Sequence, residues 1–171
     1  MNAKQLDQLH ILAVVVENKS GVLARVASLF ARRGFNIHSL AVAPTNDERF
    51  SRITIVVDLE SAPLEQIVKQ LDKLINVVRI EELHPDDAVE RELMLVAVEK
   101  GVEPHVVLDI ANRNGGYALD FDADHITFSF GGSPQRLDEV EAALTEQGIA
   151  RIQRTGRIAL KRLDAIARDG G

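Results

Sequence analysis

The stretch Leu9–Ile37, LHILAVVVENKSGVLARVASLFARRGFNI, decides the fold of this chain. Its first part, Leu9–Val16, is mostly apolar and rich in β-branched side chains, which predicts a buried strand. Turn formers follow at 17–21, and apolar residues then recur at a helical period: Val22, Leu23, Val26, Leu29 and Phe30. Gly34 ends this helix directly after two arginines, a pairing typical of helix C-termini. The stretch therefore predicts strand, loop, helix and the start of a second strand.

The same kind of pattern continues to residue 83. The second strand is expected over Phe35–Ala43. Arg52–Leu59 alternates apolar and polar side chains, so one face of this third strand is buried and the other is wetter or pairs with something else. A helix opened by Ala62-Pro63 carries one apolar stripe from Leu64 to Ile75, and Asn76–Leu83 predicts a fourth strand. This β-α-β-β-α-β order is the ferredoxin-like plan.

A second unit of the same kind follows a polar linker at His84–Ala88. The predicted elements are strands at 92–99, 117–121, 125–130 and 149–160, with helices at 104–114 and from Pro134, where Ser133 is the expected cap. Residues 161–171 are expected to form a frayed tail. We therefore predict an α+β protein of two tandem ferredoxin-like βαββαβ domains, residues 1–84 and 85–171.

Composition narrows the function. The chain has 171 residues, no Cys, a formal net charge of −6 and only 4% aromatic residues. The missing thiols exclude disulfides, thiolate metal sites and a cysteine nucleophile. The acidic balance argues against nucleic-acid binding, which needs a basic surface. The longest apolar run, Ile11–Val16, is too short to span a membrane, and Met1–Gln8 lacks the features of a targeting signal. A soluble, cytoplasmic protein is expected.

The loop before the first helix is the best candidate for a binding site. A helix N-terminus presents unpaired N–H groups and attracts a carboxylate, Gly21 permits close approach, and the Asn18 carboxamide can both donate and accept. An ordinary cap and turn is the alternative. Asn36 stands near the start of a strand, where asparagine is disfavoured unless it has a partner. It either faces solvent or, if two copies pair, faces the Asn18–Gly21 loop of the other copy.

No catalytic or metal-binding pattern emerges. Asp120, Asp122 and Asp124 imitate the start of a calcium loop, but its sixth and twelfth positions are occupied by His125 and Gly131. The five histidines lack metal-ligand spacing, and no nucleophile signature is present. We predict no catalytic residue, no metal site and no cofactor in this chain.

A set of segments distributed along nearly the whole chain closely resembles the regulatory small subunit of acetolactate synthase, also called acetohydroxyacid synthase. These segments are Val15–Val26, Phe30–Ile37, Ser39–Thr45, Ser51–Val57, Gln66–Ile75, Val89–Leu93 and Arg154–Arg157. The likeness is dense from Ile11 to Leu83 and sparser from Glu99 to Ile152. A match this long and ordered is far more specific than any single motif.

The resemblance implies that the first domain is an ACT domain, an amino-acid sensor that pairs side by side into a homodimer. Branched-chain amino acids, chiefly valine, would bind between the paired domains. By motif, Asn18, Gly21 and Val22, together with Ser20 and Leu23, would come from one chain, and Asn36 and Ile37 from its mate. His38 stands where the family usually has an acidic residue, so the resemblance does not fix how strongly the effector binds.

The resemblance also implies a non-catalytic chain in valine, leucine and isoleucine synthesis. It would bind and activate the catalytic large subunit, which carries thiamine diphosphate, Mg and FAD, and would confer feedback inhibition. A freestanding ACT-type sensor that controls transcription or a different biosynthetic enzyme is one alternative. A small enzyme on a ferredoxin-like scaffold is another, disfavoured by the missing catalytic signatures.

Overall fold

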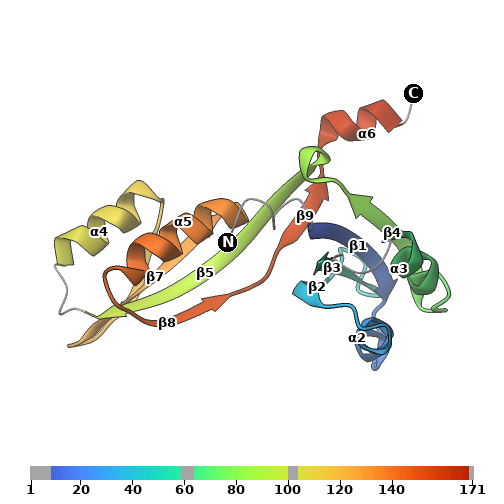
Figure 1. The fold of residues 1–171 in the computed structure, drawn as a ribbon, viewed down its shortest axis with the longest axis horizontal. Coiled ribbons are helices and arrows are strands. Elements are labelled where there is room, and N and C mark those ends of the chain that lie inside the picture. The colour runs from blue at the N-terminus through green and yellow to red at the C-terminus, as the bar shows by residue number, and fades with distance from the viewer. Residues whose placement is uncertain (1–8, 59–63, 100–103, 170–171) are drawn as a thin grey trace. The chain divides into compact units, whose positions relative to one another are not determined.

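The computed structural model describes residues 9–58, 64–99 and 104–169. They divide into two compact units. One comprises the described residues up to Val89 together with those from Arg157 onward, and the other is Glu90–Gly156. Each unit is built on an antiparallel sheet with two helices on one face (Figure 1). The predicted α+β class with two βαββαβ arrangements is confirmed.

The first unit follows the predicted order of elements. They are β1 (Leu9–Glu17), α2 (Val22–Arg32), β2 (Ile37–Pro44), β3 (Phe50–Asp58), α3 (Leu64–Leu71) and β4 (Val77–Leu83). The strand order is β2-β3-β1-β4, so that β2 and β4 form the edges and β1 lies inside. Val14 pairs with Ile53 on one side and with Ile80 on the other. The predicted start of α3 at Ala62-Pro63 lies outside the described residues.

The core of the first unit lies between its sheet and the two helices. Val22, Val26 and Phe30 of α2 are buried, as the helical period predicts. Two predicted members of the stripes are exposed: Leu23 is 42% exposed and Ile75 is 90% exposed. The helix α3 ends at Leu71, and a turn follows it. Ile75 lies beyond this turn, so the helical period no longer applies there.

The opposite face of this sheet is also covered, in part by the end of the chain. Ala159 of β9 (Ile158–Lys161) is buried in one cluster with Ile11, Val56 and Leu83. Arg157 N–H donates to Ser39 Oγ at 2.8 Å, and the Arg52 guanidinium donates to the Ala159 carbonyl at 3.1 Å. The polar face of β3 therefore pairs with another segment, the second of the two possibilities expected.

Two expectations for the C-terminal part were wrong. A single strand over 149–160 is instead divided into β8 (Ile149–Arg154) and β9, because Gly156 has φ +82° and turns the chain. The expected frayed tail contains α6 (Leu163–Asp169), whose Ala165 is buried. The predicted domains were 1–84 and 85–171, whereas the first compact unit also includes residues 85–89 and the described residues from Arg157 onward.

The second unit repeats the plan. A single 3-10 turn, η1 (Pro85–Asp87), occupies the predicted linker. It is followed by β5 (Ala88–Glu99), α4 (Pro104–Arg113), β6 (Tyr117–Phe121), β7 (His125–Gly132), α5 (Pro134–Thr145) and β8, in the strand order β6-β7-β5-β8. Ser133 caps α5 as expected, because its Oγ accepts from the Arg136 N–H at 3.4 Å. Phe128 and Phe130 fill the core with Leu137 and Leu144 of α5.

Arg154 ties the elements of the second unit together. Its guanidinium lies 2.6 Å from Glu92 Oε2 of β5, 2.6 Å from Asp138 Oδ1 and 3.2 Å from Glu141 Oε2 of α5. Burial alone would lower the pKa of Arg154, but the hydrogen bonds that it donates to Asp138 and Glu92, together with the charges of these carboxylates, outweigh burial and raise the pKa. Only 6% of the Glu92 side chain is exposed, so this carboxylate depends on the arginine.

Candidate functional site

The loop between β1 and α2 ends in an uncapped helix N-terminus. Gly21 occupies the N-cap position with φ +83° and ψ −8°, a left-handed conformation that glycine adopts at little cost. No side chain caps the helix. Among the described residues, the N–H groups of Leu23 and Ala24 meet no acceptor, whereas Val22 N–H donates to the Lys19 carbonyl at 3.3 Å. The first turn of α2 can therefore donate to an anion.

The space in front of this helix end is open. A Cβ built on Gly21 meets no heavy atom within 4 Å. The glycine thus leaves room beside the free N–H groups, as the sequence-based argument for Gly21 required.

Asn18 is held at the edge of this space by the turn between β2 and β3. Its backbone N–H donates to the Arg49 carbonyl at 2.7 Å, and its Nδ2 donates to the Glu48 carbonyl at 2.9 Å. One of the two N–H donors of this carboxamide is therefore already used. Its Oδ1 accepts no hydrogen bond from the described residues and can accept one from an ammonium group.

Glu17 fixes the other side of the loop. One carboxylate oxygen accepts from Lys19 Nζ at 2.9 Å and the other accepts from Asn76 Nδ2, while Glu17 N–H donates to the Asn76 carbonyl at 2.9 Å. Hydrogen bonds from Lys19 and then from Asn76 lower the pKa of Glu17. The carboxylate is consequently charged at neutral pH, and the loop is anchored to the segment before β4.

The structure groups the five predicted residues between Asn18 and Leu23 and separates Asn36 and Ile37 from them. Asn18, Ser20, Gly21 and Leu23 are exposed and lie in or directly after the loop. Val22 is only 4% exposed, and its side chain packs into the core of the first unit. Any contribution of Val22 to a ligand is therefore limited to its backbone.

Asn36 and Ile37 lie at the other end of α2. The helix has 11 residues, and at a rise of about 1.5 Å per residue its ends are about 16 Å apart. Asn36 is exposed, while Ile37 is half-buried against the core. Within one chain, Asn36 is thus too far from the Asn18–Gly21 loop to share one small ligand with it.

Sequence reasoning missed a bulge beside Asn36. The register of β2 with β3 shifts between Ile37, which pairs with Val57, and Ser39, which pairs with Val56. His38 is therefore the extra residue, and its side chain is exposed. The bulge lies at the start of the edge strand β2, beside Asn36. The sequence offered no signal for it.

The aspartates that imitate a calcium loop instead shape a turn. Asp122 Oδ1 accepts from the backbone N–H groups of Asp124 and His125, both at 2.7 Å, and these two hydrogen bonds lower the pKa of Asp122. Across the described ranges, no group of three or more His, Cys, Asp or Glu side chains could hold a metal ion. No helix in the same ranges is long and apolar enough to cross a membrane.

Comparisons with known proteins agree with this architecture. Residues 12–79 match the model of the AHAS small subunit-like ACT domain, and residues 91–163 match the model of the small subunit of acetolactate synthase. The acetolactate synthase small subunit of Mycolicibacterium smegmatis is 44% identical over 154 residues, which is 90% of this chain and 91% of the relative. The chain belongs to the acetolactate synthase small-subunit family.

Further members of this family are similar along the same length. The probable acetolactate synthase small subunit of Archaeoglobus fulgidus is 39% identical over 90% of this chain and 96% of its own. The crystal structure of the acetolactate synthase small subunit of Thermotoga maritima superposes with a TM-score of 0.84 at 31% identity, covering 90% of this chain and 97% of that one.

Membership confirms the predicted family, the ACT domain and the non-catalytic, regulatory character of an acetolactate synthase small subunit. It also sets aside both alternatives, the freestanding sensor of another system and the small enzyme on a ferredoxin-like scaffold. The binding-site residues predicted for this small subunit are not tested by these comparisons and stay a prediction.

Proposed function

We propose that this small subunit binds valine between two paired copies of its ACT domain and thereby confers feedback inhibition on the catalytic large subunit of acetolactate synthase. The observation that carries the proposal is the uncapped N-terminus of α2, open at Gly21 and flanked by the unused Oδ1 of Asn18. No thiamine diphosphate, Mg or FAD is assigned to this chain, because those groups belong with catalysis on the large subunit.

The three parts of valine match three features of the loop. The carboxylate would accept from the N–H groups of Leu23 and Ala24, where the helix dipole also favours a negative charge. The ammonium group would donate to Asn18 Oδ1. The isopropyl group would lie against Leu23, an apolar side chain left 42% exposed in one chain.

Pairing of two copies would complete the site. β2 is an edge strand of the first sheet, and the exposed Asn36 directly precedes it. If two β2 edges pair antiparallel, their α2 helices also run antiparallel. The Gly21 end of one helix then lies near the Asn36 end of the other, which removes the separation of about 16 Å within one chain. Asn36 and Ile37 of the second copy would complete the binding site around the ligand.

Regulation requires two states of the pair. The small subunit would associate with the large subunit and raise its activity. Valine would lower that activity only if the valine-bound pairing supports the large subunit less well than the empty pairing, because an effector acts through its differential affinity for two states. A coupling free energy of about 1–3 kcal/mol is typical of such linkage.

The decisive experiment measures acetolactate formation by the large subunit with and without this chain, titrated with valine. We expect addition of the chain to raise the rate and to make it sensitive to valine. In calorimetry, Asn36→Ala should bind valine more weakly than the parent chain. If valine leaves the reconstituted enzyme unaffected, or if this chain stays monomeric at working concentrations, the proposal is wrong.

A further inference from the structure

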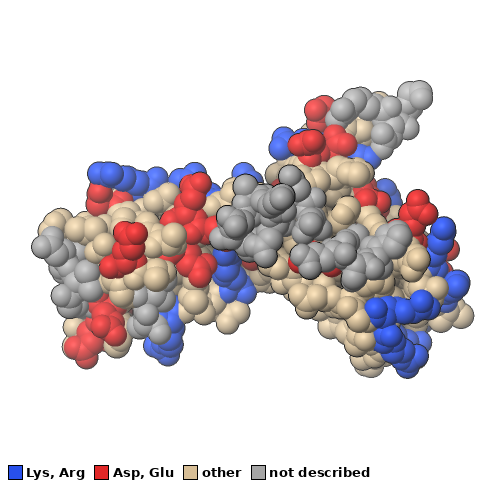
Figure 2. Space-filling model, in the orientation of Figure 1, with Lys and Arg blue, Asp and Glu red and all other residues tan. Residues whose placement is uncertain are grey.

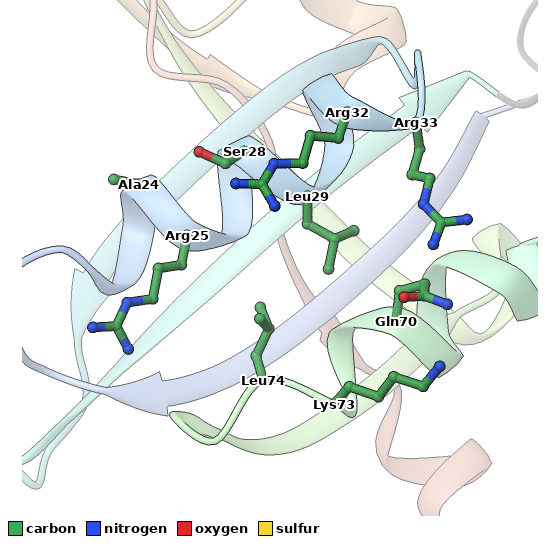
Figure 3. Close-up of a pocket in the computed structure, with 9 residues that line it drawn as sticks. All are labelled: Ala24, Arg25, Ser28, Leu29, Arg32, Arg33, Gln70, Lys73 and Leu74. Carbon is green, nitrogen blue, oxygen red and sulfur yellow. The ribbon is translucent and has the colours of Figure 1, made fainter.

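A basic groove lies between α2 and α3 of the first unit; of the residues assigned to the proposed valine site, it shares Ala24 alone. Its volume is about 430 Å³. Leu29 and Leu74 face each other across it, and Arg33 extends from the end of α2 toward the side on which Lys73 lies (Figure 3). With Arg25 and Arg32, four of the nine lining residues are cations and none is a carboxylate.

This concentration of positive charge contrasts with the acidic balance of the whole chain, whose formal net charge is −6. Figure 2 shows Lys and Arg side chains gathered over the part of the first unit where α2 and α3 lie. We name the set Arg25, Arg32, Arg33 and Lys73 the groove cations.

The groove cations also differ from other cations of the first unit in their partners. Lys19, Arg49 and Lys69 each form an ion pair with a nearby carboxylate. Among the described residues, no carboxylate pairs with any groove cation. Arg25 instead donates to the neutral Oδ1 of Asn76 at 2.8 Å. Their charge is thus not neutralised within the described part of the chain.

Helix dipoles explain only part of this arrangement. Arg32 is in the last turn of α2 and Arg33 is its C-cap, where a cation is favourable. Arg25 lies in the first turn of the same helix, where the dipole disfavours a cation. A structural role at the helix end therefore does not account for the whole set.

We propose that the α2–α3 groove is a binding site for a small, multiply charged anion, with a di- or triphosphate group as the chemistry that fits it. Its volume falls within the range of about 300–1,000 Å³ usual for small-molecule sites. Guanidinium groups bind phosphate oxygens through paired N–H donors, and a lysine adds a point charge. Cations contributed from both sides of a groove suit several linked charges better than a single one.

The test is calorimetry on the full chain with inorganic tripolyphosphate, in the absence of valine and of the large subunit. We expect saturable binding that weakens as salt is added, because exposed charges are screened. The double variant Arg32→Gln/Arg33→Gln should lose affinity about tenfold or more, and Lys73→Gln about tenfold, since each removes at least one charge-assisted contact. The thermal midpoint of each variant establishes that it is folded.

Arg151→Gln is the matched control for the single variant Lys73→Gln, because it also removes one positive charge, from an exposed arginine of β8 outside the groove. Its tripolyphosphate affinity should equal that of the parent chain. Absence of binding at millimolar tripolyphosphate, or an equal loss in the control and the groove variants, would overturn the proposal. Binding of an acidic peptide but not of tripolyphosphate would also overturn it and would mark a protein-docking surface. None of these outcomes depends on whether valine binds at the loop.

Discussion

Replacing Gly21 by Asp gives the sharpest test of the loop as an effector site. The backbone there has φ +83°, so any other residue is strained by about 1–2 kcal/mol. A carboxylate at the N-terminus of α2 regains about 0.3–1 kcal/mol from the helix dipole. The net loss of about 1 kcal/mol should lower the thermal midpoint by only about 2–4 °C. The variant should therefore fold.

The effect on valine should be much larger than the effect on folding. The new side chain extends into space that is empty within 4 Å, where the carboxylate of valine is proposed to lie. Two carboxylates about 4 Å apart repel by about 1 kcal/mol in water and about 4 kcal/mol near a protein surface. We expect the valine concentration for half-inhibition to rise about tenfold to a thousandfold, with activation of the large subunit retained.

Gly115→Asp supplies the matched control. Gly115 has φ +68°, a Cβ there also meets nothing within 4 Å, and the residue lies just past the C-terminal end of α4. The substitution adds the same charge with similar strain, and the dipole there opposes it, so this control is destabilised at least as much. Acetolactate assays should show normal valine inhibition. Unchanged inhibition in Gly21→Asp, or equal loss in both variants, would refute the reasoning.

Three further predictions concern stability. Arg154→Gln should cost about 2–4 kcal/mol in urea unfolding because it leaves the buried Glu92 unpaired, and adding Glu92→Gln should recover part of that loss; additive losses would show that the two side chains are not coupled. Gly116→Ala should cost about 1–3 kcal/mol, because its Cβ would overlap Cε1 of the buried Phe130; an unchanged thermal midpoint would contradict the packing. Arg49 holds the pKa of Asp47 below its usual value, so the stability from this carboxylate is present above about pH 3.9 and is lost as the pH falls through the folded pKa. Asp47→Asn should therefore make the thermal midpoint less dependent on pH below about 4.

The elements that periodicity could predict were those with a strong local pattern. The buried face of α2, with Val22, Val26 and Phe30, follows from helical spacing alone, and Ser133 caps α5 as its position before Pro134 indicates. The same pattern overestimated the burial of Leu23. A helical period does not tell whether a position at the margin of the apolar stripe faces the sheet or solvent. It also extended α3 to Ile75, past a turn that only the backbone hydrogen bonds reveal.

For the candidate site, the sequence by itself determined the chemistry: a glycine at a helix start, a nearby carboxamide and a family motif. Only the tertiary structure decided which groups are available. The turn between β2 and β3 accepts one N–H of Asn18 Nδ2 and leaves its Oδ1 unbonded among the described residues. The side chain of Val22 is buried in the core, and the length of α2 separates Asn36 from the loop. The return of the chain at Gly156 likewise depends on packing of Ala159 against β1 and β3. The physical reason is the same in each case: residue type and spacing report local preference, whereas burial, hydrogen-bond partners and separations in space depend on segments distant in the chain.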